Sequence, residues 1–475
     1  MHFSSLILSG LLATGPAPAS PSGPTLQATT GQTAIVGARL EIGDGRMIEN
    51  GTIVLRGDRI VAVGAGLPAP AGAKTIDGKG LTVYPGFIDA YSTGGLKLPD
   101  PTGNVGPAPN FTDTAPATMW IGNRKGIRAD VRAATSLDPK ANFATRTAQG
   151  VTSVLLSGGN GSIAGTAALF ELTPTPTALQ PDAAVEFVIR GSGFGGGDEH
   201  DEHANDTSGT QTQQPGPPPN TVPPGGVPTQ PAQNRPSQAS TAPQTYNYPG
   251  TLFGITALVR QTLYDAKQYA GEKEPTKDAT YEGLRPLVTG RVPAMFTIAN
   301  AREIARVARI ADEFGFRFIV NGAADAYRMV DLLRRRTTPV LVSLDLSDAP
   351  VKLDVTPERV YEDQMAQYRA KMQNARLLDE AGIPIAFRTA GGSSNYLSAV
   401  RQLAKLSGLP REATLRAMTA GPARIFGVDG QVGTLEVGKR ANLVLMTGDF
   451  LDEKSTVQTT FVAGIPTEAA KKEAN

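Results

Sequence analysis

KGLTVYPGFIDAYS, residues Lys79–Ser92, is the stretch on which the fold assignment depends. Within it, Gly80–Asp89 is apolar on both faces, which predicts a fully buried strand. Residues 33–63 before it have the pattern of short strands joined by tight turns. The chain therefore begins with a β module and continues into a buried strand at this point.

Beyond this strand, short apolar runs alternate with amphipathic helical patterns. The strand candidates are Val151–Leu156, Val185–Arg190, Ala294–Ile298, Arg317–Asn321, Val340–Asp345 and Ile383–Arg388. Together with the strand ending at Asp89, they make seven. Repeated β-then-α units favour parallel strands, and about eight of them predict a closed barrel. We therefore predict an α/β fold built on a (β/α)8 barrel.

Composition excludes several classes of protein. The 475 residues carry 45 basic and 44 acidic side chains, a balance that argues against a nucleic-acid partner or an anionic membrane surface. Cysteine is absent, so disulfides, thiolate zinc sites and cysteine nucleophiles are excluded. Histidine is limited to His2, His200 and His203. After the N-terminal segment, no stretch is apolar for long enough to predict a membrane span.

The two least globular segments are the N-terminus and a long insertion. An apolar run at Phe3–Leu12 followed by Ala17-Pro18-Ala19 predicts an export signal, hence a secreted or periplasmic protein. Proline and glycine dominate residues 191–250, which predicts a disordered insertion. The predicted division is 1–28 signal peptide or unstructured start, 29–80 first part of a β-sandwich, 81–190 first part of the barrel, 191–250 insertion, 251–428 second part of the barrel, 429–466 second part of the β-sandwich and 467–475 tail.

Several stretches carry a family likeness. Ala34–Gly64, Lys79–Ser92 and Ala417–Asp449 (AMTAGPARIFGVDGQVGTLEVGKRANLVLMTGD) resemble the amidohydrolase superfamily. Gly150–Gly165 (GVTSVLLSGGNGSIAG) and the predicted helix from Leu252 resemble its imidazolonepropionase-like branch. The resemblance implies a distorted (β/α)8 barrel, like that of triosephosphate isomerase, with a small composite β-sandwich formed by the two ends of the chain. It also implies hydrolysis of non-peptide carbon–nitrogen bonds by divalent metal held at the carboxyl ends of the barrel strands.

The residues at the implied ligand positions depart from that pattern. Tyr91 and Thr93 occupy the places of the first two histidines, Thr297 and Asn321 those of later histidines, and Ala390 that of the aspartate. Hydroxyls and amides are poor substitutes for imidazole on zinc, and an alanine methyl can neither bind a metal nor carry a proton. The pattern predicts a degenerate site with no bound cofactor.

Other polar residues leave a metal site open as an alternative. Asp89, Asp345, Arg388 and Thr389 follow predicted strands and could line the pocket; the two acids could serve a magnesium or calcium ion, although Asp89 is interpreted as structural. His200 and His203 lie among acidic residues and are weak candidates for a transition metal, against the simpler interpretation of a solvated acidic patch.

Three functions follow, in order of preference. The first is a non-catalytic family member, a pseudoenzyme, that binds a ligand or a partner chain, either as a homo-oligomer or with an active amidohydrolase paralogue. The second is an active hydrolase of carbon–nitrogen bonds with an oxygen-ligand metal site. The third is an envelope interaction protein that acts through the 191–250 insertion.

Overall fold

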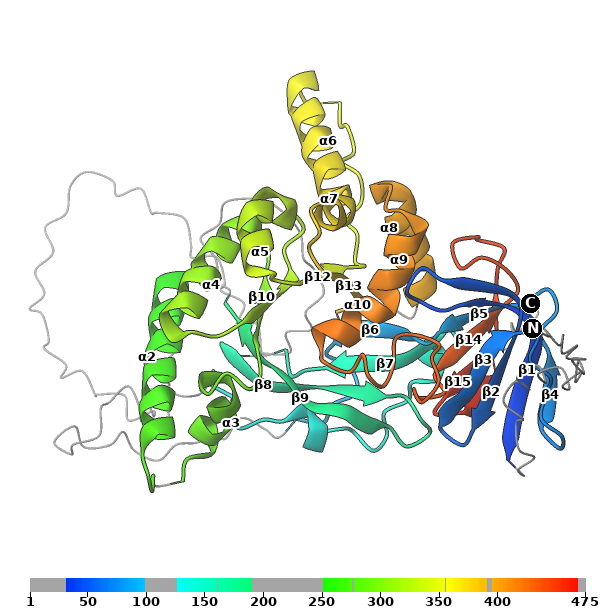
Figure 1. Ribbon diagram of the computed structural model, residues 1–475. Helices are drawn as coiled ribbons and strands as arrows, with labels where there is room; N and C mark the ends of the chain where they lie inside the picture. Colours follow the sequence, from blue (N-terminus) through cyan, green and yellow to red (C-terminus); the bar gives the residue numbers. More distant parts are fainter. Residues whose placement is uncertain are drawn as a thin grey trace, which may run out of the picture.

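The computed structural model describes residues 31–98, 126–159, 161–189, 251–275, 277–354, 356–390 and 395–468. Two β-sheets, called here sheet A and sheet B, organise these residues, with helices packed around sheet B (Figure 1). The predicted signal peptide, the 191–250 insertion, His2, His200 and His203 lie outside the described residues, as does most of the predicted tail. No helix in the described part of the chain has the length and apolar character needed to cross a bilayer.

Sheet A is built from both ends of the chain. Its order is β16-β15-β14-β5-β1-β2-β3, with β4 also paired to β1. The antiparallel pair β14–β5, which aligns Leu443 with Pro85, joins the C-terminal strands to the N-terminal ones. The bounds are β1 Gln32–Glu41, β2 Met47–Arg56, β3 Arg59–Ala65, β4 Lys74–Asp77, β5 Thr82–Pro85, β14 Leu443–Met446, β15 Val457–Val462 and β16 Ile465–Glu468. The prediction that the two ends share one small β unit is confirmed.

Sheet B forms the barrel, in the order β13-β12-β11-β10-β9-β8-β7-β6. A bridge between Ser92 and Ala390 links the ends of β6 and β13, and the Thr93 amide donates to the Ala390 carbonyl at 2.9 Å. The bounds are β6 Phe87–Ser92, β7 Val151–Leu156, β8 Ile163–Glu171, β9 Thr177–Val188, β10 Ala294–Ile298, β11 Phe318–Gly322, β12 Val340–Ser343 and β13 Ile385–Arg388. The predicted α/β barrel is therefore present, with the two ends of its sheet brought together at the carboxyl side.

One barrel strand was missed and runs against the predicted direction. β8 is antiparallel to both β7 and β9, whereas the other neighbouring pairs in sheet B are parallel. The glycine-rich run Ser157–Ser162 has the composition of a strand-to-helix turn, but the next element along the chain is the strand β8. β8 is buried at all nine positions, so it lacks the alternation that marks a half-exposed strand.

The deciding stretch is two strands and not one. β5 belongs to sheet A and β6 to sheet B, with Gly86 between them. A Cβ at Gly86 would lie 2.2 Å from Oγ1 of Thr152, so only glycine fits where the chain passes between the sheets. The Gly86 amide donates to Asn442 of the C-terminal segment, and the next amide donates to Gly150 beside β7. The glycine-bounded run Gly433–Gly438, GTLEVG, has the pattern of a strand, but it forms bends and turns.

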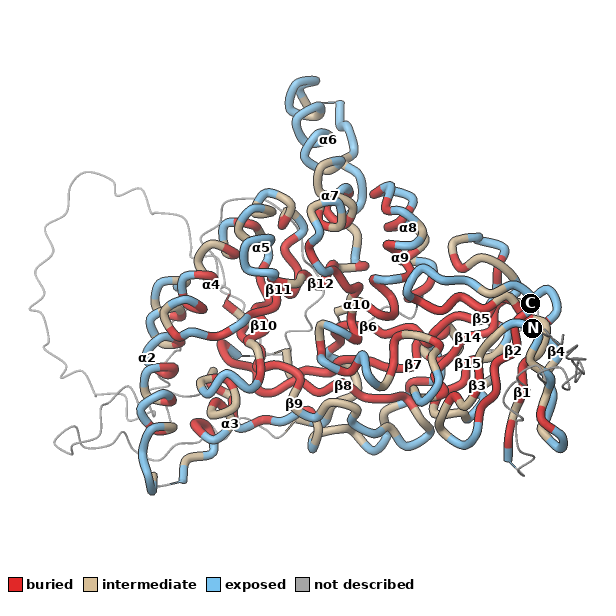
Figure 2. The backbone as a smooth tube through the Cα atoms, in the orientation of Figure 1, coloured by how far each residue is buried: buried red, intermediate tan, exposed pale blue. Residues whose placement is uncertain are grey.

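The helices pack outside sheet B, and the barrel strands form the buried interior (Figure 2). Asn300 caps α4, since its side chain accepts from the Arg302 amide at the start of that helix. The bounds are α1 Ala144–Thr147, α2 Leu252–Gly271, α3 Ala279–Val288, α4 Ala301–Phe314, α5 Val330–Arg336, α6 Glu358–Met372, α7 Asn374–Glu380, α8 Tyr396–Ser407, α9 Arg411–Met418 and α10 Ala420–Ile425.

Candidate functional site

Three of the predicted pocket residues meet at one buried carboxyl group. Tyr91 on β6 donates its hydroxyl to Oε1 of Glu186 on β9 at 2.8 Å, and Thr297 on β10 donates to the same oxygen at 2.7 Å. Asn321 on β11 donates its amide to the Thr297 hydroxyl at 2.7 Å. β9, β10 and β11 are neighbours in sheet B, and β6 reaches the same carboxyl group from the far end of that sheet. These side chains lie near the carboxyl ends of their strands, where barrel active sites lie.

Glu186 is the residue that sequence reasoning missed. Its second oxygen accepts from the Ser157 hydroxyl and from the Gly159 amide at 3.2 Å, and its side chain is buried. A lone acid in the apolar run Ala183–Val188 was the available signal, because an acidic residue is rarely buried without a partner. The loop after β7 therefore contributes to the site through hydrogen bonds to this carboxyl group.

Tyr91 links Glu186 to a cation. Burial, followed by the charge of Glu186, raises the pKa of the Tyr91 phenol well above its usual value, so the hydroxyl stays a donor. The Arg388 guanidinium carbon lies 5.6 Å from the centre of the Tyr91 ring. Arg388 also reaches over β11, since a Cβ at Gly322 would lie 3.2 Å from its Nη2. A fixed positive charge therefore lies at the barrel end beside the Glu186 cluster.

Asp89 forms a second buried cluster on β6. It pairs with Arg146 of α1 and accepts from the hydroxyl and the amide of Thr389, the latter at 3.0 Å. Arg146 also donates to Ser92 at 2.9 Å. Burial raises the pKa of Asp89, while Arg146 and the Thr389 hydrogen bonds act in the opposite direction. These contacts hold β6, α1 and the end of β13 together, which agrees with the structural interpretation of Asp89.

The other predicted residues named next form their hydrogen bonds elsewhere, although Thr93 lies beside the Glu186 cluster: a Cβ on Gly159 would be 2.5 Å from its Cγ2. Thr93 donates its hydroxyl to the Ala390 carbonyl at 3.2 Å, so this pair closes the barrel ring. Ala390 has a φ of 59°, a left-handed conformation that disfavours a side chain. Asp345 is exposed beyond the end of β12 and its amide donates to Ser343. The structure does not bring Asp89 and Asp345 together as one site.

The residues at this end of the barrel do not fit a divalent metal. Within the described ranges, no three His, Asp or Glu side chains gather closely enough to hold one. Each of the two buried carboxyl groups is already bound by its own chain, Glu186 by four donors and Asp89 by Arg146 and Thr389. Oδ1 of the fully buried Asn321 has no hydrogen-bond partner among the residues that the structure describes. A neutral amide oxygen alone makes a weak metal site.

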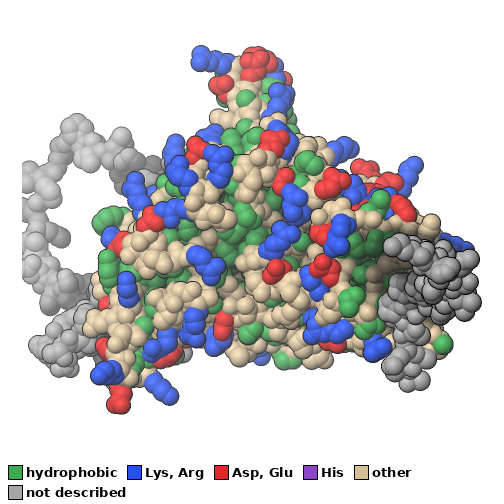
Figure 3. Space-filling view, viewed as in Figure 1, with side chains coloured by type: hydrophobic (Ala, Val, Ile, Leu, Met, Phe, Trp, Pro, Cys, Tyr) green, Lys and Arg blue, Asp and Glu red, His purple; other side chains and the backbone are tan. Residues whose placement is uncertain are grey.

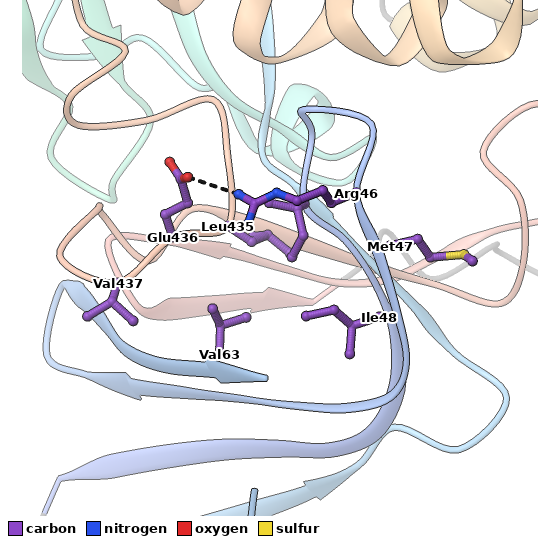
Figure 4. Close-up of a pocket in the computed structure, with 8 residues that line it drawn as sticks. Arg46, Met47, Ile48, Val63, Leu435, Glu436 and Val437 are labelled. Carbon is purple, nitrogen blue, oxygen red and sulfur yellow. Dashed lines mark hydrogen bonds and ion pairs between the residues drawn. The ribbon is translucent and has the colours of Figure 1, made fainter. Parts of the chain in front are cut away.

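A surface cavity of about 430 Å³ lies on sheet A, away from the barrel (Figure 4). Ile48, Val63 and Leu435 contribute apolar lining, and Arg46 pairs across it with Glu436 at 3.2 Å. Both charged side chains are largely exposed, so their attraction is screened by water. No nucleophile with a neighbouring base lines this cavity, and the barrel end remains the candidate site.

Comparison with known proteins agrees with the fold. Residues 341–466 match the model of the amidohydrolase family. The chain has a TM-score of 0.66 to the structure of an amidohydrolase from Thermotoga maritima MSB8, with 19% identity over 91% of this chain and 99% of that one. This second likeness concerns the fold alone.

Curated relatives match over a short stretch. An N-acetylglucosamine-6-phosphate deacetylase from Caenorhabditis elegans is 38% identical over 76 residues, 16% of this chain and 17% of that protein. A candidate N-acetylgalactosamine-6-phosphate deacetylase from Escherichia coli (strain K12) is 35% identical over 75 residues, 16% of this chain and 42% of that protein. The chain thus spans less than half the length of either relative. The chain is thus similar to the amidohydrolase family over residues 341–466, and its described residues share the fold of a solved amidohydrolase.

Proposed function

We propose that this protein is a non-catalytic member of its superfamily, which keeps the barrel as a binding scaffold and does not hydrolyse carbon–nitrogen bonds through a metal. The observation that carries the proposal is the state of Glu186. This carboxyl group lies among the positions implied for metal ligands, yet both of its oxygens accept hydrogen bonds from Tyr91, Thr297, Ser157 and Gly159.

The hydrogen bonds around Glu186 oppose metal binding energetically. A metal ion on this carboxyl group would displace the hydroxyls of Tyr91, Thr297 and Ser157. Each displaced buried hydroxyl without a new partner costs about 1–3 kcal/mol. Neutral hydroxyls and an amide would offer the ion little in return, because they are weak donors beside imidazole or carboxylate. The cluster is therefore more stable as a self-contained network.

Two positions that the family resemblance links to catalysis also hold residues unsuited to it. Ala390 stands at the position implied for the proton-carrying aspartate, and its methyl group cannot exchange a proton. Asp89 is held by Arg146, which keeps it from acting as a base. What this end of the barrel retains is a cation, Arg388, beside an aromatic ring, and an amide oxygen, Oδ1 of Asn321, without a partner among the described residues. These groups suit the recognition of a ligand better than the activation of water.

Metal content of the purified full chain tests the proposal. The experiment uses a His200→Ala/His203→Ala background, so that these histidines cannot hold a transition metal. After incubation with zinc, manganese or magnesium and removal of free ions, elemental analysis should find substoichiometric metal. Glu186→Gln should leave that content unchanged. The matched control is Glu313→Gln, a glutamate that also accepts from a tyrosine hydroxyl but lies near the surface.

One equivalent of metal that is lost in Glu186→Gln or Asp89→Asn, and kept in Glu313→Gln, would overturn the proposal in favour of an oxygen-ligand hydrolase. A parallel assay follows deacetylation of N-acetylglucosamine 6-phosphate, the reaction in the name of one curated relative. We expect no turnover above that of buffer. Turnover that disappears in Glu186→Gln would equally refute a non-catalytic role.

A further inference from the structure

Helix α6, Glu358–Met372, projects from the body of the protein (Figures 1 and 2). Its only fully buried side chain is Met372, at the end that continues into α7. The opposite end begins at Glu358, beside the segment that contains Lys352, since these two side chains form an ion pair. The space-filling view shows the same projection, with charged side chains along it (Figure 3).

A helix this exposed needs a further source of stability. At 1.5 Å per residue its 15 residues extend for about 22 Å. Isolated helices of this length are marginal in water, and most helices in proteins depend on packing of an apolar face. The tip also exposes apolar side chains: Val351 by 76%, Leu353 by 59% and Val360 by 45%. Exposed apolar side chains on a projecting element are typical of a contact surface.

The apolar residues of α6 follow a coiled-coil spacing. Tyr361, Met365, Tyr368 and Met372 are separated by four, three and four residues, which places them at alternating d and a positions of a heptad. The first three are only partly buried. Lys352 lies over the Tyr361 ring at 5.9 Å and covers one part of this stripe. Because the stripe has heptad spacing and stays partly exposed, a second helix could pack against it.

The charges of α6 select the orientation of that helix. Its first half is net acidic, with Glu358, Glu362 and Asp363, and its second half carries Arg369 and Lys371. An antiparallel copy pairs Met365 with Tyr368 of the other chain, and Tyr361 with Met372. In this register the heptad places Glu362 opposite Arg369 of the other chain, twice by symmetry. A parallel, in-register copy would instead place Glu362 near Pro357 and Arg369 near Gln364 of the other chain, and would gain neither charge pair.

We propose that α6 pairs with α6 of a second copy of this chain in an antiparallel, two-fold symmetric dimer. The apolar tip of each helix then lies near the body of the other chain, where Val351, Leu353 and Val360 are covered. This inference does not depend on the barrel pocket, and it holds for a catalytic or a non-catalytic protein.

Charge exchange on the full chain tests the dimer. Glu362 and Arg369 are exposed, so their substitution does not disturb the core. Glu362→Arg and Arg369→Glu should each raise the dimer dissociation constant about tenfold or more, since two attractive pairs become repulsive. The double variant Glu362→Arg/Arg369→Glu should restore dimerisation, and so should an equimolar mixture of the two single variants. Analytical ultracentrifugation over a concentration series measures each constant.

The double variant separates this proposal from an effect on the helix alone. Acidic residues near a helix N-terminus and basic ones near its C-terminus stabilise the helix itself. If the single variants weakened the dimer only by destabilising α6, the double variant would have the highest dissociation constant of the three. The control is Arg302→Glu/Arg309→Glu on the exposed face of α4, which should leave the dimer unchanged. A wild-type chain that stays monomeric throughout the series, or single variants that dimerise like wild type, would overturn the proposal.

Discussion

Removal of the Tyr91 hydroxyl is the sharpest probe of the Glu186 cluster. Tyr91→Phe keeps the ring that contacts Arg388 and deletes the 2.8 Å hydrogen bond to Glu186. Both partners are buried, and a hydrogen bond to a charged group contributes about 1.5–3 kcal/mol. Among the described residues, Thr297 would remain as the donor to that oxygen. We therefore expect the free energy of unfolding to fall by about 2 kcal/mol.

The matched control is Tyr264→Phe. Tyr264 also donates to a glutamate, Glu313, at 2.7 Å, but 51% of it is exposed, so water replaces the lost hydrogen bond. This variant should change stability by less than about 0.5 kcal/mol. Urea unfolding followed by far-ultraviolet circular dichroism gives both values. Equal losses in the two variants, or no loss in Tyr91→Phe, would refute the view that the Glu186 network is tightly held.

Two further predictions concern buried ionisable groups. Burial raises the pKa of Tyr84 to about 12, and it raises those of Tyr91 and Tyr396 well above the usual value. A tyrosine whose pKa is higher in the folded than in the unfolded state contributes its full stabilisation below the unfolded pKa of about 10. As the pH rises from there through the folded-state pKa, that stabilisation is lost by about 1.4 kcal/mol per group and pH unit. Of the eleven tyrosines, these three should therefore ionise only when the protein unfolds. One alkaline titration, followed by phenolate absorbance and circular dichroism, measures both events. Ionisation of all eleven tyrosines before unfolding would contradict the burial of these three. Arg146→Met should destabilise the protein by about 3–5 kcal/mol, because Asp89 is left charged and buried, and adding Asp89→Asn should recover part of that loss in urea unfolding. Additive losses from the two substitutions would mean that Asp89 and Arg146 do not depend on each other.

The sequence predicts the barrel because most of its strands are apolar runs of ordinary length between amphipathic helices. β7 and β10 begin and end where the pattern places them. The pattern does not predict β8, because this strand is buried at every position and follows a glycine-rich loop, so it shows no alternation of apolar and polar residues. The break at Gly86 was also hidden, since only the contact with Thr152 shows that the two halves of the apolar run belong to different sheets.

The candidate site was predictable in its positions and not in its contacts. Tyr91, Thr297 and Asn321 stand at positions that the family resemblance implies for metal ligands, and hydrogen bonds do connect them around Glu186. The pattern gave no reason to consider Glu186, whose role depends on donors from two other strands and a loop. Arg146 was missed for the same reason, because its partner Asp89 is 57 residues away in sequence.

The pairing of β5 with β14 has a bearing on how the chain is made. More than 350 residues separate Pro85 from its partner Leu443. At a synthesis rate of 5–20 residues per second, β5 waits roughly 20–70 s before β14 leaves the ribosome. During that time one side of β5 exposes unpaired backbone groups, which other chains could join. A nascent chain of this protein therefore needs protection of its first sheet until its last strands arrive, and premature termination anywhere before β14 should yield an aggregating fragment.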